Sequence, residues 1–255
     1  MTKPSEQLPL NGSAYFFKGF ELIQRKGIRR FVFIPLAINL ILFSFAFYYL
    51  LNQIEYLMQW IESSIPSWLA WLSIILWPLA IFSTLVIFSF IFSAVANWLA
   101  APFNGLLSER IEILLSGSSA NDDDGISAII KDIPRTLTRE WQKLKYYLPR
   151  AIGCFMLLWL IPIIGQVLWF LFIAWMMAIQ YKDYPFDNHK VSFNQMKLSL
   201  QANKGLSYSF GITVTIFSMI PLVNLIVMPV AICGATALWV DHYKQSSLTD
   251  SNKKN

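Results

Sequence analysis

The stretch MLLWLIPIIGQVLWFLFIAWMM (156–177) contains no charged residue, yet it carries Pro162 and Gly165 near its middle. Proline lacks the backbone N–H that a helix interior needs, and glycine permits a sharp turn. We therefore interpret IPIIGQ (161–166) as the tip of a helical hairpin rather than as the middle of one long span. The segment IPLVN (220–224) repeats this pattern, which predicts a second hairpin.

The two hairpins lie in uncharged stretches, 151–181 and 205–240, with basic residues on both sides of each. A helix rises about 1.5 Å per residue, and a membrane span needs about 20 residues. Once the turn is subtracted, the arms are about 13 and about 15 residues long, or roughly 20 and 23 Å. We therefore expect re-entrant hairpins that enter and leave the membrane on one side. Two full spans with proline kinks are the alternative.

The composition is that of an integral membrane protein. Of the 255 residues, 56% are hydrophobic and only 14% are charged, which is more apolar surface than a soluble domain of this length can bury. The polar N-terminus lacks the apolar segment of a signal peptide. Cys154 and Cys233 both lie in apolar stretches, so we expect two small buried side chains and neither a disulfide nor a metal site.

The distribution of charge predicts the topology. Segment 52–66 contains no basic residue, so the positive-inside rule places it outside and the other polar segments in the cytoplasm. We expect an all-α fold and a single membrane domain over 1–255. Its expected parts are a cytoplasmic amphipathic segment (1–30), a span (31–51), a long span (67–107), a second cytoplasmic amphipathic segment (108–150), the hairpins (151–181 and 205–240) and a cytoplasmic tail (241–255).

The long span raises a question of length. Residues 67–107 would form a helix of about 60 Å if unbroken. We expect it either to project beyond the bilayer or to bend at Pro78 and end near Pro102. Two spans in this stretch would place the basic residues of 110–150 outside, against the charge rule.

Two segments have the spacing of amphipathic helices. In 126–148, apolar residues recur every three or four positions while lysine and arginine occupy the other face. This favours a helix in the membrane interface, interrupted at Pro134, and the segment from Tyr15 to Ile23 has a similar pattern. The alternative for both is a helix that packs on the protein's own core.

No known catalytic motif is present. His189 lies near Asp183 and Asp187 in YKDYPFDNHK (181–190), but the chain has no HExxH, GxSxG or CxxC motif. We interpret this segment as a polar turn between the hairpins. We expect neither an enzyme, a cofactor, a metal site nor a nucleic-acid partner.

One cluster suited to anions is RKGIRR (25–30). Gly27 allows the backbone to turn, and Arg29 and Arg30 open the following helix. Amide groups at a helix N-terminus together with guanidinium groups are suited to a tetraoxyanion. The alternative is that these basic residues only set the orientation of the span and contact anionic lipid head groups.

A second cluster is FNGLLSER (103–110), at the end of the long apolar stretch. Asn104, Gly105 and Ser108 supply small polar groups and access to the backbone, and Glu109 and Arg110 restore charge. The alternative is a helix C-terminus with a glycine break.

Several runs together resemble a known family. GIRRFVFIPLAINL, NWLAAPFNGLLSERIE, REWQKLKYYLPRAI, QYKDYPFDNHK and MPVAICGATALWVD are similar to the CysZ sulfate permeases of bacterial inner membranes, from about Tyr15 to about Tyr243. The resemblance implies sulfate uptake across the cytoplasmic membrane for sulfate assimilation and cysteine biosynthesis. It also implies two long membrane helices with hemi-penetrating helix pairs, assembled into a homo-oligomer.

The family's sulfate-site motifs match this chain residue by residue. GLLxE corresponds to Gly105, Leu106, Leu107 and Glu109, and the arginine pair after a glycine corresponds to Gly27, Ile28, Arg29 and Arg30. Our hypothesis is that the two arginines supply charge and that amides near Gly27 and Gly105 supply direct hydrogen bonds. Glu109, which would repel sulfate, is expected to pair an arginine or to cap backbone amides instead.

The four apolar stretches contain no ionisable Lys, Arg, Asp or Glu side chain. The pore-lining candidates are therefore uncharged: Asn39, Asn97, Gln166 and Asn224. Without a carboxylate relay, a passive, channel-like conduit is favoured over a proton-coupled pump. The expected partners are sulfate, membrane lipid and further copies of the chain. The alternative function is a non-transporting membrane scaffold or assembly factor with an anion- or lipid-binding basic edge.

Overall fold

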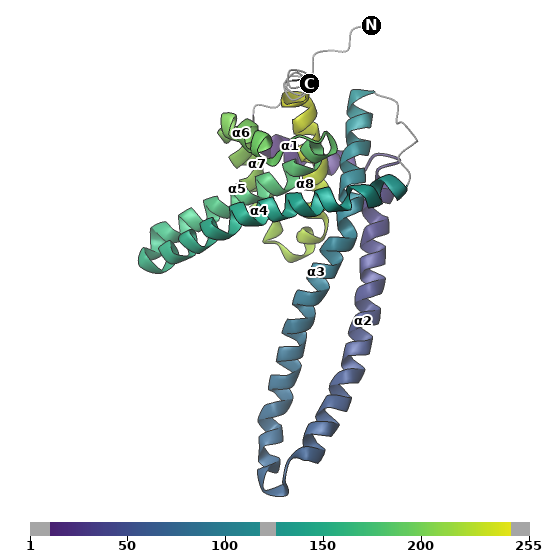
Figure 1. Cartoon of the computed structure of the whole chain (residues 1–255), viewed down its shortest axis with the longest axis vertical. Helices are drawn as coiled ribbons and strands as arrows, with labels where there is room; N and C mark the ends of the chain where they lie inside the picture. Colours follow the sequence, from purple (N-terminus) through teal and green to yellow (C-terminus); the bar gives the residue numbers. More distant parts are fainter. Residues whose placement is uncertain (1–10, 118–125, 246–255) are drawn as a thin grey trace. The chain divides into compact units, whose positions relative to one another are not determined.

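The structure is a computed structural model that describes residues 11–117 and 126–245. Every regular element in this part of the chain is a helix (Figure 1), as the sequence predicts. The elements are α1 (Gly12–Ile23), α2 (Arg29–Ser64), the 3₁₀ helix η1 (Ser67–Leu72), α3 (Ser73–Ser116), α4 (Ile126–Leu160), α5 (Pro162–Asn188), α6 (Phe193–Ala202), α7 (Lys204–Ser218) and α8 (Pro221–His242).

Four helical segments are long and apolar enough to cross a membrane. They are Arg29–Ser64, Ser73–Phe92, Ile163–Asn188 and Val223–His242. Together they support the prediction of an integral membrane protein.

The helices group into two compact units, and the single membrane domain stays a prediction. One unit, which we call the α2–α3 unit, is Phe33–Phe103. The other, the core unit, combines Met1–Val32 with Asn104–Asn255. The terminal residues and the 118–125 segment lie outside the described part of the chain.

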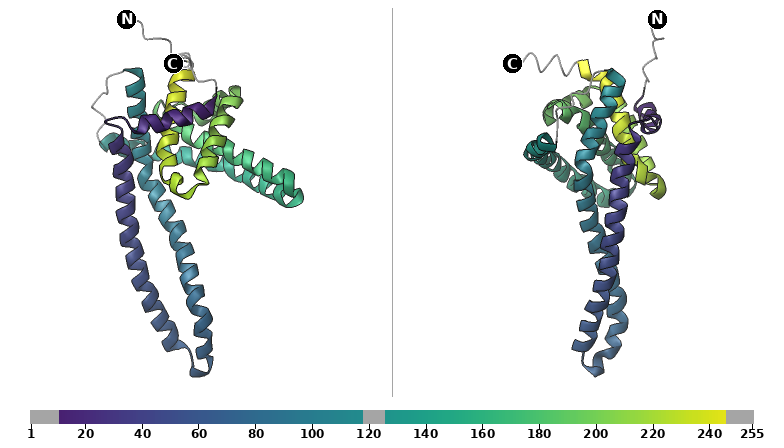
Figure 2. Two further views of the ribbon diagram at one scale, coloured as in Figure 1. Left: turned by 180° about the vertical axis from the view of Figure 1, so that it is seen from behind. Right: turned by 90° about the vertical axis from the view of Figure 1, so that its right-hand side faces the viewer.

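In the α2–α3 unit the two helices run side by side (Figures 1 and 2). Phe43 packs against Phe88 and Phe92, with ring centroids 5.7 and 5.0 Å away, and Trp77 Nε1 donates a hydrogen bond to Glu62. Most other apolar side chains of this unit are exposed, as expected for helices surrounded by lipid.

Both long helices extend beyond their predicted bounds. Helix α2 continues to Ser64 rather than ending at residue 51, because 52–64 contains no proline or glycine and is rich in good helix formers. Helix α3 is 44 residues long, about 66 Å, and does not end near Pro102. A proline removes one helical hydrogen bond, and here the helix continues on both sides of it.

The turns of both hairpins fall where the sequence places them. Helix α4 ends at Leu160 and α5 begins at Pro162, while α7 ends at Ser218 and α8 begins at Pro221. Proline suits the first helical position because that amide has no partner within the helix. Gly165 is required at the first tip, since a Cβ there would lie 2.5 Å from the Leu157 carbonyl oxygen.

The predicted arm lengths are wrong for most arms. Helix α4 has 35 residues, α5 has 27 and α8 has 22, whereas α7 has the predicted length of 15. The prediction counted only uncharged residues, but α5 continues through Lys182 and Asp183, whose polar atoms find partners inside the protein. Helix α4 also runs through Pro134 without the predicted interruption.

Helix α1 packs on the core unit's own helices. A Cβ at Gly19 would lie 2.2 Å from the Val230 carbonyl oxygen, and one at Gly234 would lie 2.4 Å from that of Tyr15. This close approach of α1 to α8 buries Tyr15 and Phe16 completely. For this segment the alternative of packing on the protein's own core is correct. In α4, by contrast, Trp141 is exposed. The location of the amphipathic segment 126–148 in the membrane interface stays a prediction.

Candidate functional site

The RKGIRR segment forms the turn and helix start that the sequence predicts. Gly27 has a φ of +92°, a left-handed conformation that favours glycine, and α2 begins at Arg29. Ile28 is buried and anchors the turn in the core. Among the first amide groups of α2, that of Phe31 already donates a 2.9 Å hydrogen bond to the Ile28 carbonyl. The amides of Arg29 and Arg30 have no earlier helical carbonyl to bond, which makes this end of the helix suitable for an anion.

The basic side chains of this turn are not neutralised. Arg25, Lys26, Arg29 and Arg30 are exposed, and none forms an ion pair with another described residue. Arg29 is partly oriented, because its Nε donates a 2.7 Å hydrogen bond to the Gln24 carbonyl. Its two terminal guanidinium nitrogens make no hydrogen bond to any described residue.

The ring of Phe31 connects this turn to FNGLLSER. The Arg30 guanidinium lies over the ring at 5.1 Å from its centroid, and the Arg110 guanidinium lies at 6.0 Å. Below them, Ile28 and Leu107 belong to the same buried apolar cluster. The structure therefore brings the two predicted segments together and adds Arg110 to the site.

The FNGLLSER segment lies inside a helix, so the alternative of a helix C-terminus is wrong. Helix α3 continues through Gly105 to Ser116, and the Gly105 carbonyl accepts a hydrogen bond from Asn188 Nδ2. The Gly105 amide lies in the helix interior, where it normally bonds the carbonyl four residues earlier. This position argues against a direct bond from that amide to an anion.

Leu106 is half-buried and Leu107 is fully buried, so both support the site as packing residues. Glu109 is exposed and, within the described part of the chain, makes no hydrogen bond or ion pair. The expected pairing of Glu109 with an arginine is therefore not found there.

A polar stripe runs along α3, and sequence reasoning singled out its members Asn104 and Ser108 but missed Glu112. Asn104 donates to the Tyr184 hydroxyl at 3.2 Å, Ser108 shares a 2.9 Å hydrogen bond with Thr236, and Glu112 contacts His189 at 2.8 Å. The signal was available, because these three residues recur at four-residue spacing in an otherwise apolar helix. These side-chain contacts stabilise the packing of the C-terminal part of α3 in the core unit.

Glu112 is the charged member of the stripe. It pairs with Lys244 at 2.9 Å as well as with His189, whose ring stacks on Trp239 at 4.3 Å between centroids. Burial alone would raise the pKa of Glu112, but the hydrogen bonds from His189 and Lys244 outweigh it and hold the pKa below its ordinary value of 4.5. Glu112 is therefore ionised at neutral pH.

The YKDYPFDNHK segment is the buried end of α5 rather than the predicted polar turn. Tyr181, Lys182, Asp183 and Phe186 are all buried, and the chain turns only after Asn188. Apolar contacts and ion pairs replace water around this segment, so it stays helical despite its charges.

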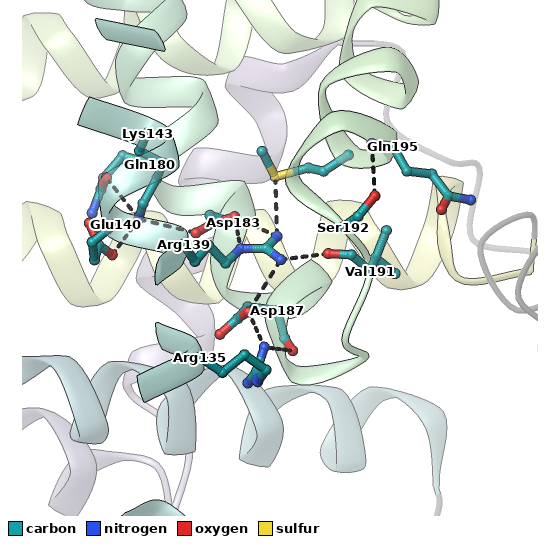
Figure 3. A network of polar contacts seen from close by, with 11 residues as sticks. Arg135, Arg139, Glu140, Lys143, Gln180, Asp183, Asp187, Val191, Ser192 and Gln195 are labelled. Atoms are coloured by element: carbon teal, nitrogen blue, oxygen red, sulfur yellow. Dashed lines mark hydrogen bonds and ion pairs between the residues drawn. The ribbon is translucent and has the colours of Figure 1, made fainter. Parts of the chain in front are cut away.

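Asp183 is at the centre of a charged network between α4 and α5 (Figure 3). Arg139 contacts Asp183 at 2.7 Å and Asp187 at 3.2 Å, and Lys143 contacts Asp183 at 3.1 Å. Burial would lower the pKa of Lys143, but Asp183 and Glu140 outweigh it and raise the pKa above its ordinary value of 10.5. These charges compensate one another, in contrast to those at RKGIRR.

The pore-lining candidates are divided between the two units. Asn39 and Asn97 belong to the α2–α3 unit, whereas Gln166 and Asn224 are exposed near the two hairpin tips. Their role stays a prediction. Among the described residues, no group of three or more His, Cys, Asp or Glu side chains is placed to hold a metal ion.

These features define an all-helical integral membrane protein with a basic site at the start of a candidate span, whose cations have no acidic partner in the part of the chain that the structure describes. The family model described as Sulfate transporter CysZ/Etoposide-induced protein 2.4 matches residues 15–229. The chain belongs to this family, and the match covers all the residues of the candidate site.

Proposed function

We propose that this protein mediates sulfate uptake across the bacterial cytoplasmic membrane, supplying sulfate assimilation and cysteine biosynthesis. The family assignment supports a sulfate-transporter role in general. The observation that carries the anion specificity is the set of cations at RKGIRR, which have no acidic partner among the described residues and are joined by Arg110 across the Phe31 ring.

In the proposed site, Arg29 and Arg30 supply the charge, and the amides at the start of α2 supply direct hydrogen bonds. Sulfate is a dianion without a proton to donate, so every oxygen accepts. Phosphate carries a proton at neutral pH, and a site made only of donors leaves that proton without an acceptor. The site should therefore prefer sulfate.

The conduit is proposed to be passive. The apolar stretches contain no carboxylate to relay protons, and a charged side chain at mid-membrane costs at least roughly 2.5–3.5 kcal/mol. Asn39, Asn97, Gln166 and Asn224 remain the candidates to line the path.

We further propose that the α4–α5 and α7–α8 hairpins are re-entrant. Their tips are apolar and uncovered, with Ile163 82% exposed and Leu225 62% exposed, so hydrocarbon is the environment that would cover them. Basic residues flank both hairpins, which favours the cytoplasmic side for both ends of each. The homo-oligomer implied by the family resemblance would enclose the conduit between subunits.

The test is sulfate flux into liposomes that contain only the purified protein. Arg29→Ala/Arg30→Ala should abolish saturable uptake, because charged hydrogen bonds contribute about 1.5–3 kcal/mol each, or at least tenfold in affinity. Lys190→Ala/Lys204→Ala removes the same charge from two exposed positions elsewhere and should leave uptake intact. Excess phosphate should compete poorly. Unchanged flux in the arginine double variant would place the anion site elsewhere.

A non-transporting scaffold is the second candidate function. The family description also contains an etoposide-induced protein, a name that states no transport activity. The long exposed apolar faces of α2 and α3 are compatible with partner binding. Folded protein that binds sulfate but carries no flux in liposomes would favour this function.

A further inference from the structure

A basic pocket lies on the surface between α4 and α6, away from the residues assigned to sulfate. Its volume is about 360 Å³. Its lining residues are Gln142, Lys145, Tyr146, Arg150, Phe193, Asn194 and Lys197. Three of them are cations and, in this described part of the chain, none of the lining residues is acidic.

Two of the cations are held against one aromatic ring. The Arg150 guanidinium lies 3.8 Å from the Tyr146 ring centroid and donates a 2.9 Å hydrogen bond to the Tyr146 carbonyl. The Lys197 ammonium lies 5.2 Å from the same ring and 5.9 Å from that of Phe193. Cation–π contacts of this kind hold the charges in place without neutralising them.

The two aromatic rings that line the pocket, Tyr146 and Phe193, are held in place by neighbouring side chains. The Tyr146 hydroxyl accepts a 3.1 Å hydrogen bond from Trp175 Nε1 on α5. Phe193 is buried and meets the Tyr146 ring edge-on at 5.9 Å. The pocket is therefore already formed by side chains of α4 and α6 that are supported by α5.

The cations of the pocket lack acidic partners. Lys145, Arg150 and Lys197 form no ion pair with any described residue, whereas the nearby Lys143 pairs with both Glu140 and Asp183. Three uncompensated cations around one pocket favour an anionic ligand.

The position of the pocket indicates the kind of anion. Arg150 is the last charged residue before the uncharged stretch 151–181. Beyond it, Ile152, Phe155 and Met156 are each at least half exposed. Basic and aromatic side chains beside an exposed apolar surface are typical of a membrane interface that contacts anionic lipid.

We propose that this pocket binds the phosphate group of an anionic phospholipid, whose acyl chains lie along the exposed apolar surface of α4. Arg150 and Lys197 contact the phosphate, and Lys145 contributes charge at the rim. The proposal does not depend on sulfate transport.

The test is native mass spectrometry of the full-length protein in detergent, titrated with phosphatidylglycerol or with phosphatidylcholine of the same acyl chains. The wild type should retain phosphatidylglycerol preferentially. Arg150→Gln/Lys197→Gln should weaken that retention by about tenfold or more, since each basic residue near a membrane surface contributes about 1 kcal/mol. Lys190→Gln/Lys204→Gln removes the same charge elsewhere and should retain the preference.

Two further measurements keep the result interpretable. Lys197→Arg preserves the charge and should preserve binding, which separates loss of charge from loss of fold. Millimolar inorganic phosphate should not displace the lipid. Displacement by phosphate would assign the pocket to a soluble anion, and equal retention of the two lipids, or no effect of the double variant, would overturn the proposal.

Discussion

The Arg110 guanidinium lies over the ring of Phe31, 6.0 Å from its centroid, although the two residues belong to different helices. Arg30 approaches the same ring at 5.1 Å. One aromatic side chain thus holds cations from both segments that the sequence assigns to the anion site. Because the ring does not neutralise them, they remain available to a dianion.

Replacing Phe31 should weaken sulfate binding while leaving the charges in place. We expect Phe31→Leu to raise the sulfate dissociation constant about two- to fivefold, since an exposed cation–π contact contributes about 0.5–1 kcal/mol. Isothermal titration in detergent measures this directly. Phe31→Tyr keeps the ring and serves as the control, and equal affinity in the leucine variant would remove Phe31 from the site.

The network around Asp183 should be a major source of stability. Arg139→Met leaves the buried Asp183 with an incomplete set of partners, and breaking a buried pair costs about 3–5 kcal/mol. Thermal unfolding in detergent should show a clearly lower midpoint. Glu140→Gln alters an exposed partner of Lys143, so its effect should stay within about 1 kcal/mol. Equal effects of the two variants would contradict this assignment.

The sequence was sufficient for the features that depend on local chemistry. Pro162 and Gly165 mark one hairpin turn, and Gly27 marks the turn before α2, because proline restricts the backbone and glycine frees it. Proline alone is not sufficient, since α3 and α4 continue through Pro102 and Pro134. The all-helical class follows from the apolar stretches in the same way.

Features that depend on tertiary partners could not be predicted in this manner. YKDYPFDNHK contains enough charge to resemble a solvated turn, and only the placement of Arg139 beside Asp183 makes its burial possible. Glu112 was overlooked in favour of Glu109, since the partners of Glu112, His189 and Lys244, are distant in sequence.

The Glu112 cluster predicts a specific dependence of stability on pH. The pKa of Glu112 is lower in the folded state than its ordinary value of 4.5. The ionised carboxylate therefore stabilises the fold at pH values above 4.5. This contribution is lost as the pH falls through the lowered pKa. Glu112→Gln should therefore unfold at a lower temperature than the wild type at neutral pH, and the gap should close under acid.

Unfolding midpoints measured from neutral to acidic pH check this prediction. Glu109→Gln is the matched control, because Glu109 is exposed and unpaired among the described residues, and its effect should stay within about 0.5 kcal/mol. A gap between wild type and Glu112→Gln that is independent of pH would show that the carboxylate charge is not what stabilises the fold.

The contact between α1 and α8 should not tolerate an added methyl group. A Cβ at Gly19 would lie 2.2 Å from the Val230 carbonyl oxygen, which is backbone and cannot move aside cheaply. We expect Gly19→Ala to destabilise the protein by about 1–3 kcal/mol. Gly205→Ala, where nothing lies within 4 Å of the new Cβ, should be neutral or slightly stabilising in the same thermal assay.

The re-entrant arrangement predicts that the first hairpin tip is shielded from the outside of the cell. In a background in which Cys154 and Cys233 are replaced, Ile163→Cys should resist a membrane-impermeant maleimide added to spheroplasts, because the exposed tip lies in hydrocarbon. Glu62→Cys, in the segment predicted to face outward, should react under the same conditions. Lys190→Cys should react only in inverted vesicles. If α4 and α5 instead cross the membrane completely, the tip emerges on the outer face, and Ile163→Cys would be labelled as readily as Glu62→Cys.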